Sequence, residues 1–226
     1  AELEYQSNYD TLTGLANRNL LCDRVSQAMA RAASRGEQAW LVCIDLDRFR
    51  LINETLGHDA GDLVLKATAA RLQAMLAPTD TAARTGGNEF MLVLADAPDE
   101  HAAVGTAQRI MAGLAEPVRI GDHQHFLCCT SGLSMFPADG DTADALIKNA
   151  HIAMHRAKEG GAGKLQFYTA SMHARAMERL RLEADLRHAV ERDQLLLHYQ
   201  PQVDVRTGRI VGIAVLLRWT HPELGM

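Results

Sequence analysis

The spacing of apolar residues along the chain predicts alternating helices and strands. From Asn19 to Arg35, apolar residues recur every three or four positions and Gly36 follows, which is typical of a helix with one buried face and a glycine stop. Residues 41–46 form a short apolar run that ends in acids, which favours a buried strand. A further helix is expected from about Asp59 to Leu76, and Pro78 would end it.

Consecutive glycines in the middle of the chain predict a β-hairpin. Gly86 and Gly87 lie inside the segment Thr81–Asp96, and glycine supplies the positive φ angles that a tight turn demands. The elements expected after the hairpin are a helix over Asp99–Ala115, a second strand pair around Val118–Ile120 and Phe126–Phe136, and a helix over Thr142–Lys158. This order predicts a mixed α/β (α+β) domain with antiparallel strand pairs.

The composition changes after Tyr168, where a charged stretch with heptad-like Leu and Ala positions predicts a connecting helix. Two strands with a Thr-Gly turn are expected to follow before the chain ends at Met226. About 45 residues are too few to close a core of their own. We therefore expect this tail to be the beginning of a second domain.

Composition and charge exclude several classes of function. The 226 residues carry a formal net charge of −5, which argues against a surface that neutralises a nucleic acid or an anionic membrane. No stretch approaches the roughly 18 apolar residues of a membrane span, and the N-terminus does not read as a signal peptide. The four cysteines show no metal-ligand spacing. We expect a cytoplasmic protein with free thiols and, if it binds phosphate groups, a small ligand.

Carboxylates at the ends of two predicted strands are the candidate chemistry. Asp45 and Asp47 end the strand at 41–46, and Glu89 follows the Gly-Gly turn about forty residues later. Such carboxylates could meet over one site, and Mg²⁺ bound with nucleotide phosphates takes one or two ligands of this kind. On spacing alone, a solvated strand end beside a simple hairpin is the plainer interpretation.

Four ordered motifs favour the functional interpretation. They are DTLTGLANR (Asp10–Arg18), DLDRFRLINETLGHDAGD (Asp45–Asp62), ARTGGNEF (Ala83–Phe90) and AMHRAKEGG (Ala153–Gly161). Together they strongly resemble the GGDEF family of diguanylate cyclases, over about Tyr9 to Tyr168. Downstream, LHYQPQVDVRTGRIVGIAVLLRWTHPELG resembles the first two strands of the EAL phosphodiesterase family.

The resemblance implies a fold and a division of the chain. The expected fold is a ferredoxin-like palm with a central mixed or antiparallel sheet flanked by helices, followed by an incomplete fragment of an EAL barrel. The expected segments are the end of an upstream signalling helix (1–8), a GGDEF domain (9–169), a linker helix (170–193) and the truncated start of an EAL domain (194–226). Family members join two GTP molecules into cyclic di-GMP across a two-fold dimer. The implied partners are therefore GTP with Mg²⁺, a second copy of the chain, an upstream sensor and the protein's own EAL domain.

The resemblance also assigns roles to single residues. The carried-over set comprises the Mg²⁺ ligands Asp45, Leu46 (through its carbonyl) and Glu89, the guanine contacts Asn53 and Asp62, and the phosphate contacts Gly86, Gly87 and Lys158. Asn53 and Asp62 are also residue types that cap helices, and Lys158 would complement a helix dipole. The remaining expectations are a structural or outer-shell role for Asp47, core positions for Phe49 and Phe90, and surface or capping positions for His58 and His151.

Both family signatures lack a carboxylate. Asn88 stands at the third signature position, where active cyclases have Asp or Glu, and a neutral amide is a poorer ligand for Mg²⁺. Ala214 stands where active EAL domains have a metal-binding glutamate, while Gln200 and Arg218 match ligand-contacting positions of that family. The EAL portion is therefore expected to be inactive.

Two further positions depart from the family pattern. Ala162 replaces a frequent arginine, and the product-inhibition motif at 77–80 retains only Asp80. We therefore expect a degenerate GGDEF domain that binds GTP with Mg²⁺ weakly and serves as a regulatory or dimerisation module. A weakened but genuine diguanylate cyclase is the alternative, because Asp45, Glu89 and Lys158 persist.

Overall fold

A computed structural model describes residues 6–170, 182, 184–190, 192–222 and 225. The chain divides into two compact units, residues 1–173 and residues 174–226. Each unit is described by itself. Among the helices of the described ranges, none is both long and apolar enough to cross a membrane.

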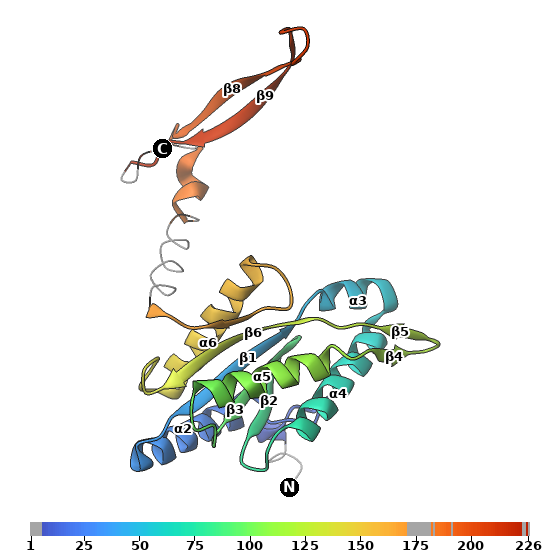
Figure 1. Cartoon of the computed structure of the whole chain (residues 1–226), viewed down its shortest axis with the longest axis vertical. Helices are drawn as coiled ribbons and strands as arrows, with labels where there is room; N and C mark the ends of the chain where they lie inside the picture. The colour runs from blue at the N-terminus through green and yellow to red at the C-terminus, as the bar shows by residue number, and fades with distance from the viewer. Residues whose placement is uncertain (1–5, 171–181, 183, 191, 223–224, 226) are drawn as a thin grey trace. The chain divides into compact units, whose positions relative to one another are not determined.

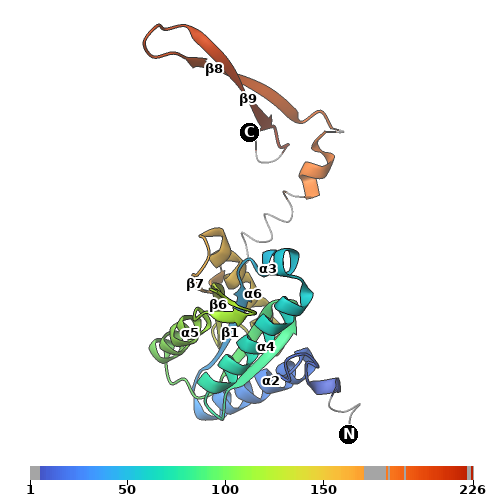
Figure 2. The ribbon, with the colours of Figure 1, turned by 90° about the vertical axis from the view of Figure 1, so that its right-hand side faces the viewer.

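The first unit is a mixed sheet covered by helices on both faces (Figures 1 and 2). Its helices are α2 (Arg18–Arg35), α3 (Phe49–Leu56), α4 (His58–Met75), α5 (Glu100–Leu114) and α6 (Ala143–Glu159). Its strands are β1 (Ala39–Leu46), β2 (Thr81–Gly86), β3 (Glu89–Leu94), β4 (Val118–Ile120), β5 (His123–His125), β6 (Cys129–Phe136) and β7 (Leu165–Phe167).

The five-stranded sheet has the order β2-β3-β1-β6-β7. β1 pairs antiparallel with β3 and with β6, whereas β6 and β7 are parallel. The sheet is therefore mixed, as expected for the palm fold. Every residue of the central strand β1 is buried, which explains its continuous apolar sequence.

Two hydrophobic layers hold the helices on the sheet. On one face α4 and α5 pack against alternate residues of β1 and β3, and the fully buried Phe90 belongs to this layer. On the other face α2 and α6 pack against the intervening residues, such as Leu41 and Met91. Phe49 also lies in the core, at 9% exposure, so the core positions of Phe49 and Phe90 are confirmed.

The predicted pairing around Val118–Ile120 is wrong. β4 pairs with β5 across Gly121, whose φ of 59° permits a tight turn, and the two form a separate short ribbon. β6, which lies within the segment predicted as the partner, joins the central sheet beside β1 instead. Its residues 129–134 are all buried, as a strand covered on both faces requires.

Besides β5, two short elements were not predicted. α3 buries only Phe49, so its apolar pattern is too brief to stand out, and β7 has three residues. The predicted helix over 170–193 lies largely outside the described residues, although residues 184–189 are helical.

The second unit contains an antiparallel hairpin of β8 (Leu195–Val203) and β9 (Ile210–Trp219). Gly208 in its turn has a φ of 68°, and the predicted pair of strands with a Thr-Gly turn is confirmed. Exposed apolar side chains, including Tyr199, Ile213 and Leu217, lie along both strands.

Candidate functional site

The candidate site forms where β1 ends beside the β2-β3 turn. The register of the sheet sets Asp45 directly opposite Glu89, so the two strand-end carboxylates meet as expected. Asp45 is only 5% exposed, although it is an acid, and burial raises its pKa. A buried carboxylate needs hydrogen-bond donors around it.

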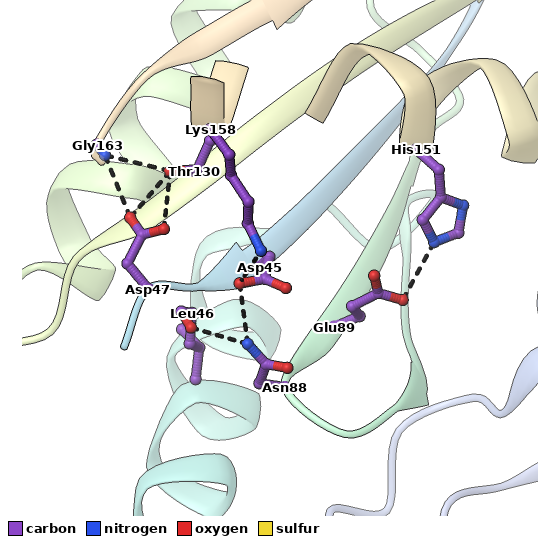
Figure 3. A network of polar contacts seen from close by, with 9 residues as sticks. All are labelled: Asp45, Leu46, Asp47, Asn88, Glu89, Thr130, His151, Lys158 and Gly163. Carbon is purple, nitrogen blue, oxygen red and sulfur yellow. Dashed lines mark hydrogen bonds and ion pairs between the residues drawn. The ribbon is translucent and has the colours of Figure 1, made fainter. Parts of the chain in front are cut away.

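The side-chain amide of Asn88 supplies one such donor. Its Nδ2 lies 2.9 Å from Asp45 Oδ1 and 2.8 Å from the carbonyl oxygen of Leu46 (Figure 3). Both neighbours accept hydrogen bonds only, so the amide nitrogen, and not the amide oxygen, must face them. Asn88 therefore bridges the two groups that the family resemblance assigns to the metal.

Lys158 supplies the second donor to Asp45. It lies in the last turn of α6, and its Nζ is 2.8 Å from Asp45 Oδ1 (Figure 3). The hydrogen bond and positive charge of Lys158 lower the pKa of Asp45, but burial outweighs them and the pKa stays above its usual value. Lys158 thus does more than complement the helix dipole.

His151 is a site residue that the sequence reasoning placed wrongly at the surface or at a cap. It is half-buried in α6, with Nε2 3.1 Å from Glu89 Oε2 and Nδ1 3.0 Å from the carbonyl oxygen of Ile147. The missed signal is spacing, because His151 and Lys158 are seven residues apart and share one face of the helix. His58, in contrast, is exposed at the start of α4, as expected.

The contact between His151 and Glu89 shifts both pKa values. Hydrogen bonding to Glu89 raises the pKa of His151, and hydrogen bonding from His151 lowers the pKa of Glu89. Both ring nitrogens of His151 face acceptors, which is the arrangement that an imidazolium satisfies. The pair is therefore stabilised as an ion pair.

The pair should contribute to stability in a defined pH window. A raised histidine pKa gives stability that is full below the unfolded value of 6.5 and is lost as the pH rises through the folded pKa. A lowered glutamate pKa gives stability that is full above 4.5 and is lost as the pH falls through the folded pKa. In urea unfolding, His151→Gln should therefore cost about 1 kcal/mol between these two values and less on either side.

The matched control is His58→Gln, the same change at an exposed histidine of α4. The difference in unfolding free energy between this variant and the parent should not follow the same pH window. A cost for His151→Gln that stays constant from pH 5 to pH 9 would show that the ion pair contributes nothing.

The signature turn is fixed by a contact from the first motif. Gly86 and Gly87 have φ values of 145° and 51°, and the Arg84 guanidinium donates to the Gly87 carbonyl at 3.1 and 2.8 Å. Arg84 also lies 3.1 Å from the carboxylate of Asp10, which Thr13 engages as well. Burial raises the pKa of Asp10, but the hydrogen bonds from Thr13 and Arg84 hold it below its usual value. Asp10 and Arg84 lie in two of the four sequence motifs, but this role was not expected for them.

Asp47 has the structural role expected of it. Its carboxylate accepts hydrogen bonds from the Thr130 hydroxyl at 3.0 and 2.9 Å and from the Gly163 backbone N–H at 3.2 Å (Figure 3). These contacts tie the segment after α6 to the end of β1. They hold the neighbourhood of Lys158 in place.

Asn53 and Asp62 lie on neighbouring helices and do not cap them. Asn53 is inside α3 and Asp62 is inside α4, whose N-cap is Gly57. Gly61 makes room for Asn53, because a Cβ on Gly61 would come within 1.9 Å of Asn53 Oδ1. Within the described residues, neither side chain has a hydrogen bond to the protein. Their assignment to a guanine stays a prediction.

Asp80, which the family resemblance assigns to the end of a product-inhibition motif, stabilises a local turn. Asp80 accepts hydrogen bonds from the backbone N–H groups of Ala77, at 3.2 Å, and of Ala95, at 3.0 Å. Burial raises its pKa, although these hydrogen bonds act in the opposite direction. Each carboxylate oxygen of Asp80 thus has a backbone partner.

In the second unit, the EAL-like residues share one face of the hairpin. Gln200 and Ala214 are directly opposite each other, and Arg218 is four residues further along β9. Residues two and four apart in a strand project to the same side. Ala214 carries only a methyl group, so it brings no metal ligand to this face.

In this arrangement, the candidate metal ligands of the first unit do not fit a divalent cation. Asp45 and the Leu46 carbonyl are bridged by the amide N–H groups of Asn88, and Glu89 is held by His151. Among the described residues, no group of three or more His, Cys, Asp or Glu side chains is placed to hold a metal ion. A cation would have to displace protein donors from each of its ligands.

Comparison with known families identifies both parts of the chain. The family model described as "Diguanylate cyclase, GGDEF domain" matches residues 7–164, and that of the EAL domain matches residues 183–226. Similar relatives include the "Bifunctional diguanylate cyclase/cyclic di-GMP phosphodiesterase MucR" of Pseudomonas aeruginosa, 39% identical over 100% of this chain. The "Cyclic di-GMP phosphodiesterase PdeR" of Escherichia coli is 37% identical over 99%. The chain spans 33% of the length of each of these two proteins.

Solved structures of the same family have the fold of the first unit. A sensory box/GGDEF family protein from Caulobacter crescentus is 42% identical, with a TM-score of 0.66 over 68% of this chain and 99% of that one. The GGDEF domain of TpbB (YfiN) from Pseudomonas aeruginosa is 35% identical, with a TM-score of 0.72 over 75% of this chain and 99% of that one. The chain therefore belongs to the GGDEF family of diguanylate cyclase domains and continues into the first part of an EAL domain.

Proposed function

We propose that this GGDEF domain is a guanine-nucleotide-binding regulatory or dimerisation module of cyclic di-GMP signalling, with little or no cyclase activity. The observation that carries the proposal is the Asn88 amide, which bridges Asp45 and Leu46 with hydrogen bonds where active family members have an acid. An amide that donates to these oxygens does not add a ligand for Mg²⁺, and joining two GTP molecules into cyclic di-GMP depends on charge stabilisation at the phosphates.

The names of similar proteins support a role in cyclic di-GMP signalling. Those described above are named as cyclic di-GMP enzymes, and the GGDEF domain of DgcB from Caulobacter crescentus, 27% identical with a TM-score of 0.65 over 71% of this chain and 93% of that one, was solved in complex with c-di-GMP. In a protein organised like these longer relatives, the domain would act on an EAL domain of the same chain, on an upstream sensor or on a second copy of itself. The EAL portion present here would add no hydrolysis, because Ala214 offers no metal ligand.

Nucleotide binding without turnover rests on the groups that remain. The side chains of Asn53 and Asp62 have no hydrogen-bond partner within the described part of the protein, so they are free to pair with a guanine edge. Gly86 and Gly87 have no side chains and adopt positive φ angles, so the backbone of the turn is open where phosphates would approach. These features favour GTP over ATP, because a site built for one base edge rejects another.

Calorimetric titration tests the proposal. We expect GTP to bind more tightly than ATP, and Asp62→Ala to weaken GTP binding about tenfold or more, because a hydrogen bond to a charged group contributes about 1.5–3 kcal/mol. Lys66→Ala, a change at an exposed residue one turn further along α4, is the matched control and should bind GTP as the parent does.

Product analysis by mass spectrometry completes the test. After incubation of the parent with GTP, little or no cyclic di-GMP is expected. The alternative, a weakened cyclase, is favoured by the retained Asp45 and Glu89, and steady formation of cyclic di-GMP in proportion to protein would establish it. Absence of GTP binding would refute the nucleotide module altogether.

A further inference from the structure

All three assigned metal ligands of this domain already have protein donors. The Asn88 amide donates to Asp45 Oδ1 and to the Leu46 carbonyl, Lys158 Nζ lies 2.8 Å from the same Asp45 oxygen, and His151 lies 3.1 Å from Glu89. Four parts of the fold, β1, the β2-β3 turn, β3 and α6, meet to make these contacts (Figure 3). The oxygens that would bind a cation are thus satisfied without one.

The balance of charge in the site agrees with these contacts. An acid at position 88 would set a third carboxylate beside Asp45 and Glu89, and like charges so close together require a counter-ion. With Asn88, two carboxylates remain, and each faces a basic side chain of α6: Lys158 beside Asp45 and His151 beside Glu89. Each of these two carboxylates thus has a polar partner on α6 without a cation.

We propose that the Asn88 amide and the Lys158 ammonium take the place of the divalent cation, so that this site excludes the metal and holds a phosphate-bearing ligand without it. The exclusion of the metal stands on the contacts alone, whereas the ligand part rests on the proposed nucleotide function. The amide fills the position between Asp45 and Leu46 with two hydrogen-bond donors, and a metal would leave that amide without partners.

The first experiment uses Mn²⁺ alone as the probe, followed by electron paramagnetic resonance. The parent should show no stoichiometric Mn²⁺ site. Asn88→Asp replaces the donor by an anionic oxygen and should create a one-to-one site, with affinity higher by about 10–100-fold. Asn19→Asp, the same change at an exposed residue in the first turn of α2, should behave as the parent does.

A second variant keeps the experiment decisive if Asn88→Asp does not fold. Asn88→Ala removes the bridging donor and adds no charge, so Mn²⁺ binding should rise above the level of the parent. Binding of Mn²⁺ to the parent in a one-to-one site, unchanged in Asn88→Ala, would overturn the proposal.

The second experiment separates this inference from the proposed function. GTP is titrated into the parent with Mg²⁺ present and again with excess EDTA, and the two affinities should agree within about threefold, while Asn88→Asp becomes dependent on Mg²⁺. If GTP binds the parent only with Mg²⁺, metal-free binding is wrong and the nucleotide module stands. If GTP binds under neither condition, the nucleotide module fails, and the Mn²⁺ result alone decides on exclusion of the metal.

Discussion

Replacing Asn88 by aspartate is expected to raise cyclic di-GMP formation by this chain about 10²–10³-fold, because one well-placed electrostatic group in an active site contributes on that scale. The change removes the N–H donors that bridge Asp45 and the Leu46 carbonyl and puts an anionic oxygen in their place. The two oxygens would then share a cation with the new carboxylate. Product is measured by mass spectrometry at saturating GTP and Mg²⁺, with protein concentrated enough to form dimers.

The control for this activity gain is Asn19→Asp, which adds the same charge at an exposed residue far from Asn88 in the sequence. It should leave product formation at the parental level. If Asn88→Asp folds, binds GTP and dimerises but makes no more product than the parent, then the defect lies elsewhere, and Ala162→Arg is the next variant to combine with it. A parent that turns over as fast as Asn88→Asp would show a working cyclase.

Hydrophobic spacing was enough to predict most of the fold. The helices now seen as α2 and α4 and the buried strand β1 follow from apolar periodicity, and the β2-β3 hairpin follows from two adjacent glycines. The pairing of β4 could not be predicted in this way, because both candidate partners, β5 and β6, follow it closely in the sequence. Only the long-range contact of β6 with β1 decides between them.

The sequence and the family resemblance indicated the acids of the candidate site and Lys158, but not His151. Strand-end acids are visible in the sequence, so the meeting of Asp45 and Glu89 was expected. The apolar stripe of α6 indicates the helix face that covers the sheet, but His151 lies 62 residues from Glu89, so no local pattern indicates this partner. The orientation of the Asn88 amide likewise depends on acceptors that only the folded chain brings together.

The helix α6, which carries His151 and Lys158, packs closely against Gly132 of β6. We therefore expect Gly132→Ala to lower the free energy of unfolding by about 3 kcal/mol. A Cβ on Gly132 of β6 would lie 2.1 Å from the backbone nitrogen of Met154 and 2.4 Å from the carbonyl oxygen of Ala150. These are backbone atoms of α6, so no side-chain rotation relieves the clash, and the helix must move off the sheet. In a domain of this size, the loss corresponds to a fall of about 6–12 °C in the midpoint of thermal unfolding.

A Gly→Ala substitution at another position of the domain should instead increase the free energy of unfolding. A Cβ on Gly105, in the interior of α5, meets no atom within 4 Å, and Gly→Ala in a helix stabilises by about 0.5–1 kcal/mol. Gly105→Ala should therefore unfold slightly above the parent, and Gly132→Ala far below it. Since α6 carries both His151 and Lys158, a shift of the helix should also separate Lys158 from Asp45 and His151 from Glu89. Equal midpoints for Gly132→Ala and the parent would mean that α6 does not depend on this contact, and the bases would have to be held over the carboxylates by the rest of the helix.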